Sequence, residues 1–321
     1  MGSEARIALA GSGSSLAGPV FAVWQDAFNR QYSSIRVGYI PTSSGEGIRQ
    51  ITLLLGDFAV GEIPLSHEQL NNPTVHLTQL PIAVMGVVPI YNVPVSAQLR
   101  FTGELLAQVY MGNVANWSDS RIAILNPGVR LPNLPIVSVR RPRGSGTRYI
   151  FTQFLSQRSH EFRSWIEDPQ HAARPDMTAA VSKDMVERVA LTPGAIGYVE
   201  RTFALHSGVA VGRIQNRSGK FVEASEASIG ATCKAMEKLI PDDFVVSMFN
   251  AEGEKSYPLV GFVWVYVPVS GLAPERRDAL QQFLNWSLDE GQALLAGKDY
   301  LPLSGALAKR AQAKLQSTLL Q

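Results

Sequence analysis

Short apolar runs that end in small polar residues occur three times along the chain. RIALAG leads into GSGSSLAG, IRVGYI into PTSSGEG, and LPIVSVRR into PRGSGT. After each loop, apolar residues follow at the three- and four-residue spacing of one helix face. The pattern predicts the unit strand, Gly/Ser loop, helix three times over. Strands that alternate with helices favour an α/β fold with mixed, mainly parallel sheets flanked by helices.

The three predicted helices each have an apolar face. Pro19 lies near the first turn of the first helix, a position where its missing N–H costs nothing. The predicted core-facing residues are Val20, Trp24, Ala27 and Phe28 in the first helix, Ile48, Ile51, Leu54 and Leu55 in the second, and Ile150, Phe151, Phe154 and Leu155 in the third.

Two further apolar runs, VMGVVPIYN and PLVGFVWVYV, lie far apart in the sequence. A chain of 321 residues is long enough for two domains. We therefore expect the two runs to be crossovers between two lobes, with residues 5–85 and 262–321 in lobe I and 86–261 in lobe II. The longest apolar stretches are shorter than the roughly 20 residues that a membrane helix needs.

Charge and cysteine content exclude several classes of function. The chain has 29 basic and 27 acidic residues, and its net charge of +2 does not favour nucleic acid as a partner. Cys233 is the single cysteine, so the chain has neither an internal disulfide nor a cysteine-based zinc site. We expect Cys233 to be a packed apolar residue rather than a nucleophile.

The beginning of the chain bears on where the protein works. Met1-Gly2-Ser3 reads like a vector-derived addition directly before the first strand, and no charged-then-apolar signal peptide is present. We expect that a leader has been removed and that the protein is periplasmic or extracellular.

The three loops have the chemistry of an anion site. The start of a helix offers unpaired N–H groups and the positive end of the helix dipole, and Ser and Thr hydroxyls add further donors. None of the loops has the lysine of a G-x-x-x-x-G-K-[ST] phosphate loop, and the chain has no G-x-S-x-G nucleophile elbow. We therefore expect binding of a small oxyanion without catalysis, metal or cofactor.

The third loop also lies in an arginine-rich stretch, RRPRGSGTR, at residues 140–148. Arg140 and Arg141 are adjacent on a strand and face opposite ways, so only one of them can enter a single socket. We expect Arg148 to be solvated, while Arg143 either raises the potential at the cleft mouth or is a plain surface residue. TPGAIGYVE and VANWSD are interpreted as scaffold.

A set of segments, in order along nearly the whole chain, resembles the phosphate-binding proteins of bacterial phosphate ABC importers, the PstS family. The segments are GSGSSLAGPVFAVW, SSGEGIRQI, GDFAVGEIPLS, VYMGNVANWSD, LNPGVRLPNLPIVSVRRPRGSGTRYIFTQFL, TPGAIGYVE and DYLPL. The resemblance implies a two-lobed type II periplasmic binding fold that closes over a phosphate ion in an interlobe cleft. It also implies an ABC permease as membrane partner and a monomeric receptor.

The resemblance assigns ligand-binding roles by motif. The implied phosphate ligands are Ser15 and the amide of Leu16 in the first loop, Ser44 in the second, Ser145, Gly146 and Thr147 in the third, and Arg141 as the fixed cation. The family has an aspartate where Glu62 stands in DFAVGE, as the acceptor of the phosphate proton. The family also commonly has an aspartate where this chain has Arg143.

Glu62 would test whether the anion carries a proton. Phosphate carries a proton at neutral pH and can donate it to the carboxylate. Sulfate carries none, so its oxygen lone pairs are repelled by the carboxylate and sulfate is rejected. The plain alternative is that Glu62 is an exposed loop acid. The alternatives at the level of function are a receptor for another tetrahedral oxyanion, or a phosphate-sensing or scavenging protein without transport.

Overall fold

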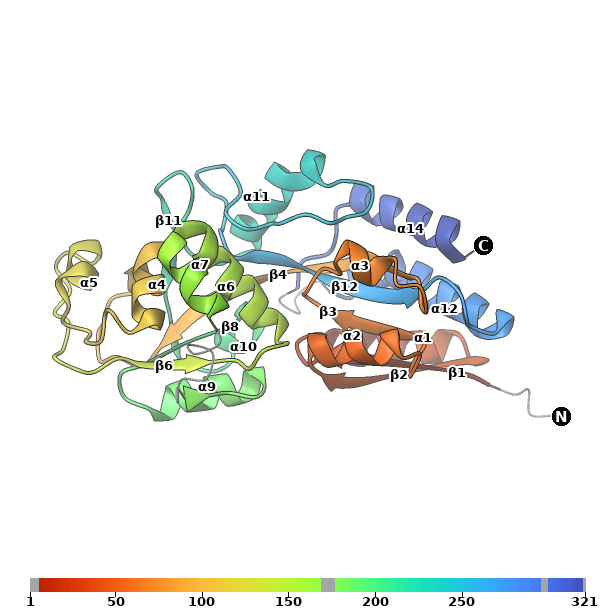
Figure 1. Ribbon diagram of the computed structural model, residues 1–321, viewed down its shortest axis with the longest axis horizontal. Helices are drawn as coiled ribbons and strands as arrows, with labels where there is room; N and C mark the ends of the chain where they lie inside the picture. Colours follow the sequence, from red (N-terminus) through yellow and green to blue (C-terminus); the bar gives the residue numbers. More distant parts are fainter. Residues whose placement is uncertain (1–5, 169–176, 296–299, 320–321) are drawn as a thin grey trace.

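The computed structural model describes residues 6–168, 177–295 and 300–319 (Figure 1). Residue 5 of the predicted lobe I, the Met1-Gly2-Ser3 start and Asp299 of the DYLPL segment lie outside these ranges.

The first half of the chain alternates strands with helices. Its elements are β1 Ile7–Ser14, α1 Gly18–Gln31, β2 Ile35–Thr42, α2 Ser44–Thr52, β3 Phe58–Gly61, α3 His67–Leu70, β4 Leu77–Tyr91, β5 Arg100–Phe101, α4 Gly103–Met111, α5 Ser120–Leu125, β6 Val137–Arg140, α6 Gly146–Arg158 and α7 His160–Glu167.

The second half adds shorter strands and the closing helices. Its elements are β7 Met177–Thr178, α9 Ser182–Leu191, β8 Ala195–Glu200, α10 Arg201–Leu205, β9 Ala210–Val211, β10 Arg213–Gln215, β11 Phe221–Val222, α11 Glu226–Met236, the 3₁₀ turn η1 Glu237–Leu239, β12 Val260–Pro268, α12 Pro274–Ser287, α13 Glu290–Ala293 and α14 Gly305–Leu319.

One mixed sheet runs through the molecule in the order β2-β1-β3-β12-β4-β8-β6-β7, with β9 also paired to β4. The outer pairs are parallel: β1 with β2 and β3, and β6 with β7 and β8. The central pairs that involve β12 and β4 are antiparallel. The mixed α/β fold predicted from the sequence is therefore confirmed, with the parallel pairing concentrated in its two outer parts.

The two apolar runs predicted as crossovers form β4 and β12. Every residue of both strands is buried, as expected where helices cover both faces of a sheet. β4 pairs with β12 from Leu77 to Gly86 and then with β8 from Val87 to Tyr91. Figure 1 shows β1–β3 with α1, α2 and α12 at one end of the long axis, and β6, β8, α4–α7 and α9 at the other. The exact lobe boundaries stay a prediction.

The predicted helix faces are largely as expected. Val20, Trp24 and Phe28 are buried in α1 and Ala27 is half-buried, while the four predicted residues of α6 are all buried. The prediction for the second helix was wrong in part. Ile48 and Ile51 are buried, but α2 ends at Thr52, and Leu54 and Leu55 are exposed. The helical period stops there because Leu54 takes a left-handed conformation, with φ of 53°.

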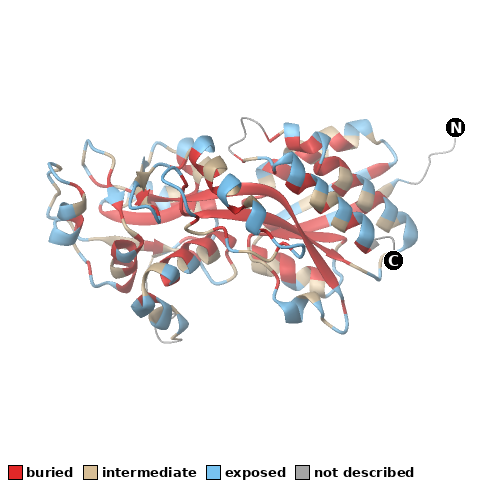
Figure 2. Ribbon diagram, turned by 90° about the horizontal axis from the view of Figure 1, so that it is seen from above, coloured by how far each residue is buried: buried red, intermediate tan, exposed pale blue. Residues whose placement is uncertain are grey.

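Aromatic side chains pack together at each end of the molecule. Phe21 lies against Phe58 and Tyr39 at one end, and Phe151 stacks on Tyr198 at the other with ring centroids 4.0 Å apart. Figure 2 shows the buried strands between helices that expose one face. Within the described ranges, no helix combines the length and the apolar character that crossing a bilayer requires.

Candidate functional site

Two loops from opposite ends of the molecule meet directly. The Gly45 amide, in the first turn of α2, donates to the Gly144 carbonyl, just before α6, with 2.9 Å between N and O. A Cβ atom on Gly45 would lie 2.9 Å from the Gly144 Cα. Glycine at position 45 allows this close approach, and Gly144 has a left-handed φ of +85° that favours glycine. The N-termini of α2 and α6 therefore face one small volume.

In the first loop, both the carbonyls and the predicted ligand amide of Leu16 are hydrogen-bonded within the protein. β1 continues through Ser14, whose Oγ accepts from the Leu16 amide at 3.3 Å. The carbonyls of Ser14 and Leu16 accept from Tyr39 and Tyr300, at 2.7 and 2.5 Å. Ser15 is half-buried and Leu16 is buried. Because the carbonyl oxygens are occupied, this loop is suited to an anion.

The second loop holds the predicted acceptor. Ser43 caps α2 by accepting from the Glu46 amide, which leaves Ser44 as the first helical residue. The Ser44 hydroxyl donates to Glu62 Oε2 at 2.7 Å. Glu62 follows β3 directly and is only 2% exposed, so the plain alternative of an exposed loop acid is wrong. Its Oε1 has no hydrogen-bond partner in the described part of the chain.

The third loop brings three predicted residues to the same place. Ser145 caps α6 by accepting from the Arg148 amide at 3.3 Å, and Gly146 and Thr147 are the first two helical residues. All three are buried. A Cβ on Gly146 would overlap Glu62 Oε2 and the Ser44 hydroxyl, so Glu62 packs directly on the start of α6. The Thr147 hydroxyl donates to Glu200, the last residue of β8.

Arg141 is the buried cation of the site, with 4% of its surface exposed. Its Nη1 donates to Ser182 Oγ at 3.0 Å and its Nη2 to the Ala180 carbonyl at 3.2 Å. Its amide donates to the Tyr198 hydroxyl. A guanidinium has five N–H donors, and Nε of Arg141 has no partner among the described residues. The group is held in place and keeps donors for an anion.

The other arginines of the 140–148 stretch differ in their surroundings. Arg140 faces away from Arg141, as predicted, and lies over the Trp165 ring at 4.9 Å. Arg143 is exposed. The expectation of a solvated Arg148 was wrong, because Arg148 is half-buried and its Nη1 donates to the Arg141 carbonyl at 2.9 Å.

Two buried carboxylates shape the electrostatics. Burial raises the pKa of Glu62 to about 7, and the negative charge of Glu200 adds to the rise. Hydrogen bonds from Ser14 and Ser44 and the charge of Arg141 act in the opposite direction. Glu62 therefore exchanges its proton in the neutral range, where phosphate also does.

Sequence reasoning missed three residues that the structure places in or behind the site. Ser14 lies close enough to Glu62 to lower its pKa, Ser182 accepts from Arg141, and Glu200 accepts from Thr147. Of these three residues, only Glu200 could have been suspected from the sequence. It ends the apolar strand AIGYVE, where a carboxylate is costly to bury unless it has a partner. The eight predicted ligand residues keep their roles as predictions.

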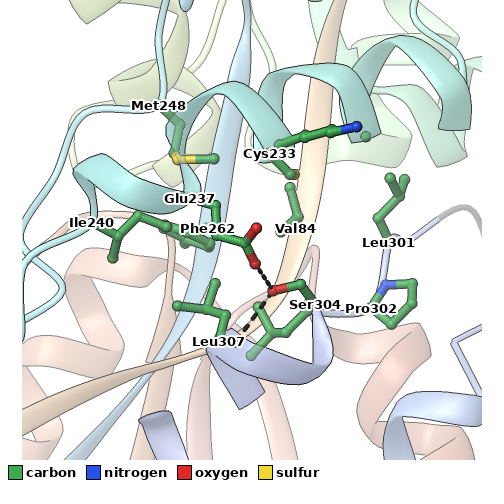
Figure 3. Close-up of a pocket in the computed structure, with 13 residues that line it drawn as sticks. Val84, Cys233, Glu237, Ile240, Met248, Phe262, Leu301, Pro302, Ser304 and Leu307 are labelled. Carbon is green, nitrogen blue, oxygen red and sulfur yellow. Dashed lines mark hydrogen bonds between the residues drawn. The ribbon is translucent and has the colours of Figure 1, made fainter. Parts of the chain in front are cut away.

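One cavity lies beside this cluster, and a larger one lies elsewhere. A cavity of about 150 Å³ adjoins Glu62 and is walled by Tyr149, Phe249 and Trp264 among others. A second, of about 360 Å³, lies between α11, β4, β12 and the start of α14, and contains none of the predicted ligand residues (Figure 3). Ser304 donates to Glu237 at its rim. Burial raises the pKa of the half-buried Cys233 in its wall to about 12, which agrees with a packing role.

The comparisons with known proteins cover nearly the whole chain. The family model of the PBP superfamily domain matches residues 2–290. The phosphate-binding protein PstS of Xylella fastidiosa (strain Temecula1) is 30% identical over 310 residues, which cover 96% of this chain and 84% of the relative.

Solved structures show the same fold. One is a phosphate ABC transporter substrate-binding protein with bound phosphate from Clostridium perfringens, at TM-score 0.67 and 19% identity, covering 92% of this chain and 100% of that one. Another is a high affinity periplasmic phosphate-binding protein (PfluDING) bound with phosphate, at TM-score 0.75 and 18% identity. The match covers 96% of this chain and 93% of that one. The chain thus belongs to the PBP superfamily, and within it to the family of the phosphate-binding proteins PstS.

Proposed function

We propose that the protein is a receptor that binds inorganic phosphate between the N-termini of α1, α2 and α6 and delivers it to an ABC importer. The first, second and third loops supply neutral N–H and O–H donors, Arg141 supplies one fixed charge, and Glu62 accepts a proton. Such a set holds a small oxyanion without neutralising it by many lysines, which agrees with a net charge of only +2.

One observation carries this proposal: the buried carboxylate of Glu62 packs on the start of α6 while its Oε1 has no partner among the described residues. A carboxylate in that place repels an unprotonated sulfate and accepts from a protonated phosphate. The names of the PstS relatives support phosphate over other tetrahedral oxyanions, and their transport role supports delivery over sensing alone.

Further parts of the proposal concern partners and location. We place the protein outside the cytoplasmic membrane, like the periplasmic PfluDING protein, as a monomer that meets an ABC permease. We propose that the receptor is not an enzyme, because the relatives that it matches are named phosphate-binding proteins. Within the described ranges, no group of three metal-ligating side chains comes together.

Calorimetric titration of the protein with phosphate, arsenate, sulfate and molybdate tests this function. We expect phosphate and arsenate to bind and sulfate and molybdate to bind far more weakly. Glu62→Gln should reduce the difference in affinity between phosphate and sulfate, mainly by strengthening sulfate binding. The amide can donate a hydrogen bond to sulfate, whereas the carboxylate repels it. Wild-type binding of sulfate as tight as that of phosphate would overturn the role of Glu62.

Two further assays separate other classes of function. Turnover of a chromogenic phosphate ester would indicate an enzyme, and salt-dependent retention of DNA would indicate a nucleic-acid partner. We expect neither. Absence of phosphate binding under all conditions would overturn the proposal as a whole.

A further inference from the structure

We propose that the cavity beside α11 is a second binding site, which takes a medium-chain aliphatic carboxylate with its chain inside the cavity and its carboxylate at Lys234 (Figure 3). This inference does not rest on the proposed phosphate site, because none of the predicted phosphate ligands lines the cavity.

The walls of this cavity are apolar and come from elements that lie far apart in the sequence. The strands β4 and β12 contribute Val84 and Phe262, the segment before α14 contributes Leu301, and α14 contributes Leu307. Figure 3 shows these side chains around one space, together with Met248. The volume is about 360 Å³. Sites for small molecules are typically hollows of about 300–1,000 Å³ with mainly apolar walls and a few polar groups.

Gly230 adds to the open space of the cavity. It lies inside α11 and lines the cavity. A Cβ atom on Gly230 would have Leu301 Cδ2 as its neighbour at 3.8 Å, which is an ordinary van der Waals distance. Packing therefore does not require a glycine here, although glycine is the least favourable residue in a helix interior after proline. The chain gives up helix stability at this position and keeps the volume free for a ligand.

The charged groups at the cavity favour an anionic head group. The Glu237 carboxylate already accepts a hydrogen bond from the Ser304 hydroxyl, which in turn accepts from the Leu307 amide. Lys234 lies three residues before Glu237 and is exposed. Its ammonium group forms no ion pair or hydrogen bond with any described residue. A carboxylate ligand can therefore pair with Lys234, whereas an ammonium ligand would have to compete with Ser304 for Glu237.

The volume of the cavity sets the length of the aliphatic chain. A water molecule takes about 30 Å³ of liquid volume, so a cavity of about 360 Å³ holds about twelve non-hydrogen atoms. A straight-chain carboxylate of about ten carbons has that many atoms. We therefore expect decanoate to fill the cavity and longer chains to extend into solvent.

Calorimetric titration of the phosphate-free protein with straight-chain carboxylates from butanoate to dodecanoate tests this site. Each buried CH₂ group should raise the affinity about fourfold, and the rise should level off at about ten carbons. Octylamine should bind about fivefold more weakly than octanoate. A rise that continues through dodecanoate would indicate adsorption to an open surface, and tighter binding of octylamine would indicate a site for cations. Either result would overturn the inference.

Gly230→Leu tests whether the chain occupies this cavity. The new side chain places about four carbons in the space, so the affinity should level off at about six carbons and octanoate should bind about tenfold more weakly. Leucine favours a helix over glycine, so the melting temperature should hold or rise. An unchanged dependence on chain length in this folded variant would mean that the carboxylate binds elsewhere.

Lys234→Met tests the head group, and Lys238→Met is its matched control. Lys238 is also exposed and follows on the same side of the sequence, but it does not line the cavity. Lys234→Met should weaken octanoate binding about fivefold and remove the preference over octylamine. Lys238→Met should change neither quantity. Equal losses in the two variants would mean that surface charge attracts the carboxylate without a specific contact.

Cys233 locates the ligand independently, because it is the single cysteine of the chain and lies in the cavity wall. Saturating octanoate should slow the alkylation of this thiol by N-ethylmaleimide, since the aliphatic chain covers it. Unchanged alkylation in a sample that binds octanoate by calorimetry would overturn the inference. If the thiol reacts too slowly to measure, the chain-length series in Gly230→Leu decides the location. Absence of binding by every carboxylate of the series would reject this second site and leave the phosphate receptor intact.

Discussion

At the scale of single residues, Arg141 and Arg143 lie in the same short stretch but in opposite environments. Arg141 is buried and fixed by Ser182 and Ala180, whereas Arg143 is exposed. A charge-assisted hydrogen bond contributes about 1.5–3 kcal/mol. We therefore expect Arg141→Ala to weaken phosphate binding by at least about tenfold in calorimetry. Arg143→Ala is the matched control and should change little. Equal losses of phosphate affinity in both variants would mean that the arginine-rich stretch attracts anions by its overall charge rather than through Arg141.

Glu62 also makes a prediction about stability, because its pKa differs between the folded and the unfolded chain. Burial raises the pKa to about 7 from an ordinary value of 4.5, so the folded protein holds this proton more tightly. The stabilisation is complete below the unfolded pKa and is lost as the pH rises through the folded one. We expect the free energy of unfolding of the phosphate-free protein to fall by on the order of 3 kcal/mol between these two pH values because of Glu62.

Chemical denaturation of the phosphate-free protein at a series of pH values measures this loss. In Glu62→Gln the corresponding part of the pH dependence should vanish, because an amide does not titrate. Glu187→Gln, at an exposed position, should keep the wild-type profile. A Glu62→Gln profile that overlays the wild type would show that this carboxyl is not the titrating group.

The residue scale is also where prediction from sequence was weakest. The second and third Gly/Ser loops come together in the fold, since Ser44 and Gly146 lie against Glu62 and Thr147 donates to Glu200. That these loops bind an anion stays a prediction. The motif alone does not show that β1 continues to Ser14 and so places that hydroxyl beside Glu62. It also does not reveal a partner brought from another strand, as Glu200 is.

At the scale of elements, the apolar period predicted α1 and α6 well because these helices pack one continuous face on the sheet. It failed at the end of α2, where a backbone conformation ended the helix before the apolar run ended. Periodicity reports which face a helix would bury, whereas a helix end depends on a local turn that apolar spacing does not encode.

The contact between α2 and the loop before α6 gives a prediction at this scale. Gly45→Ala places a methyl group 2.9 Å from the Gly144 backbone, which must move away. Alanine favours a helix over glycine by about 1 kcal/mol, so the thermal stability of the phosphate-free protein should hold or rise. Phosphate affinity should nevertheless fall by about tenfold or more, since the two donor sets no longer meet.

Gly305→Ala at the start of α14 is the control for this substitution, because a Cβ there meets open space. It should leave phosphate affinity unchanged. Unchanged affinity in Gly45→Ala as well would mean that the ligand-bound site does not depend on close approach of the second and third loops.

At the scale of the whole molecule, β4 and β12 carry the chain between its two ends, and the proposed anion position lies where those ends touch. The sheet continues through β4, whose pairing passes from β12 to β8 at Gly86 and Val87. Among the residues that the structure describes, the second and third loops are joined by one backbone hydrogen bond, from Gly45 to Gly144. The two ends are therefore joined firmly through the sheet and lightly at the cleft, which is the arrangement of a hinge.

We expect the cleft to open without ligand and to close on phosphate, and small-angle X-ray scattering measures this. A compact chain of this length has a radius of gyration of about 20 Å. Saturating phosphate should reduce the measured value by a few per cent and raise the melting temperature, since a ligand at about 100 times its Kd contributes about 2.7 kcal/mol. Arg141→Ala, with an affinity at least about tenfold lower, should gain at most about 1.4 kcal/mol at the same phosphate concentration, because the proposed function gives Arg141 the fixed charge that holds the anion. Equal scattering of the wild type with and without phosphate, in a sample that binds phosphate by calorimetry, would mean that the ligand enters an already closed site and that β4 and β12 act as a rigid support.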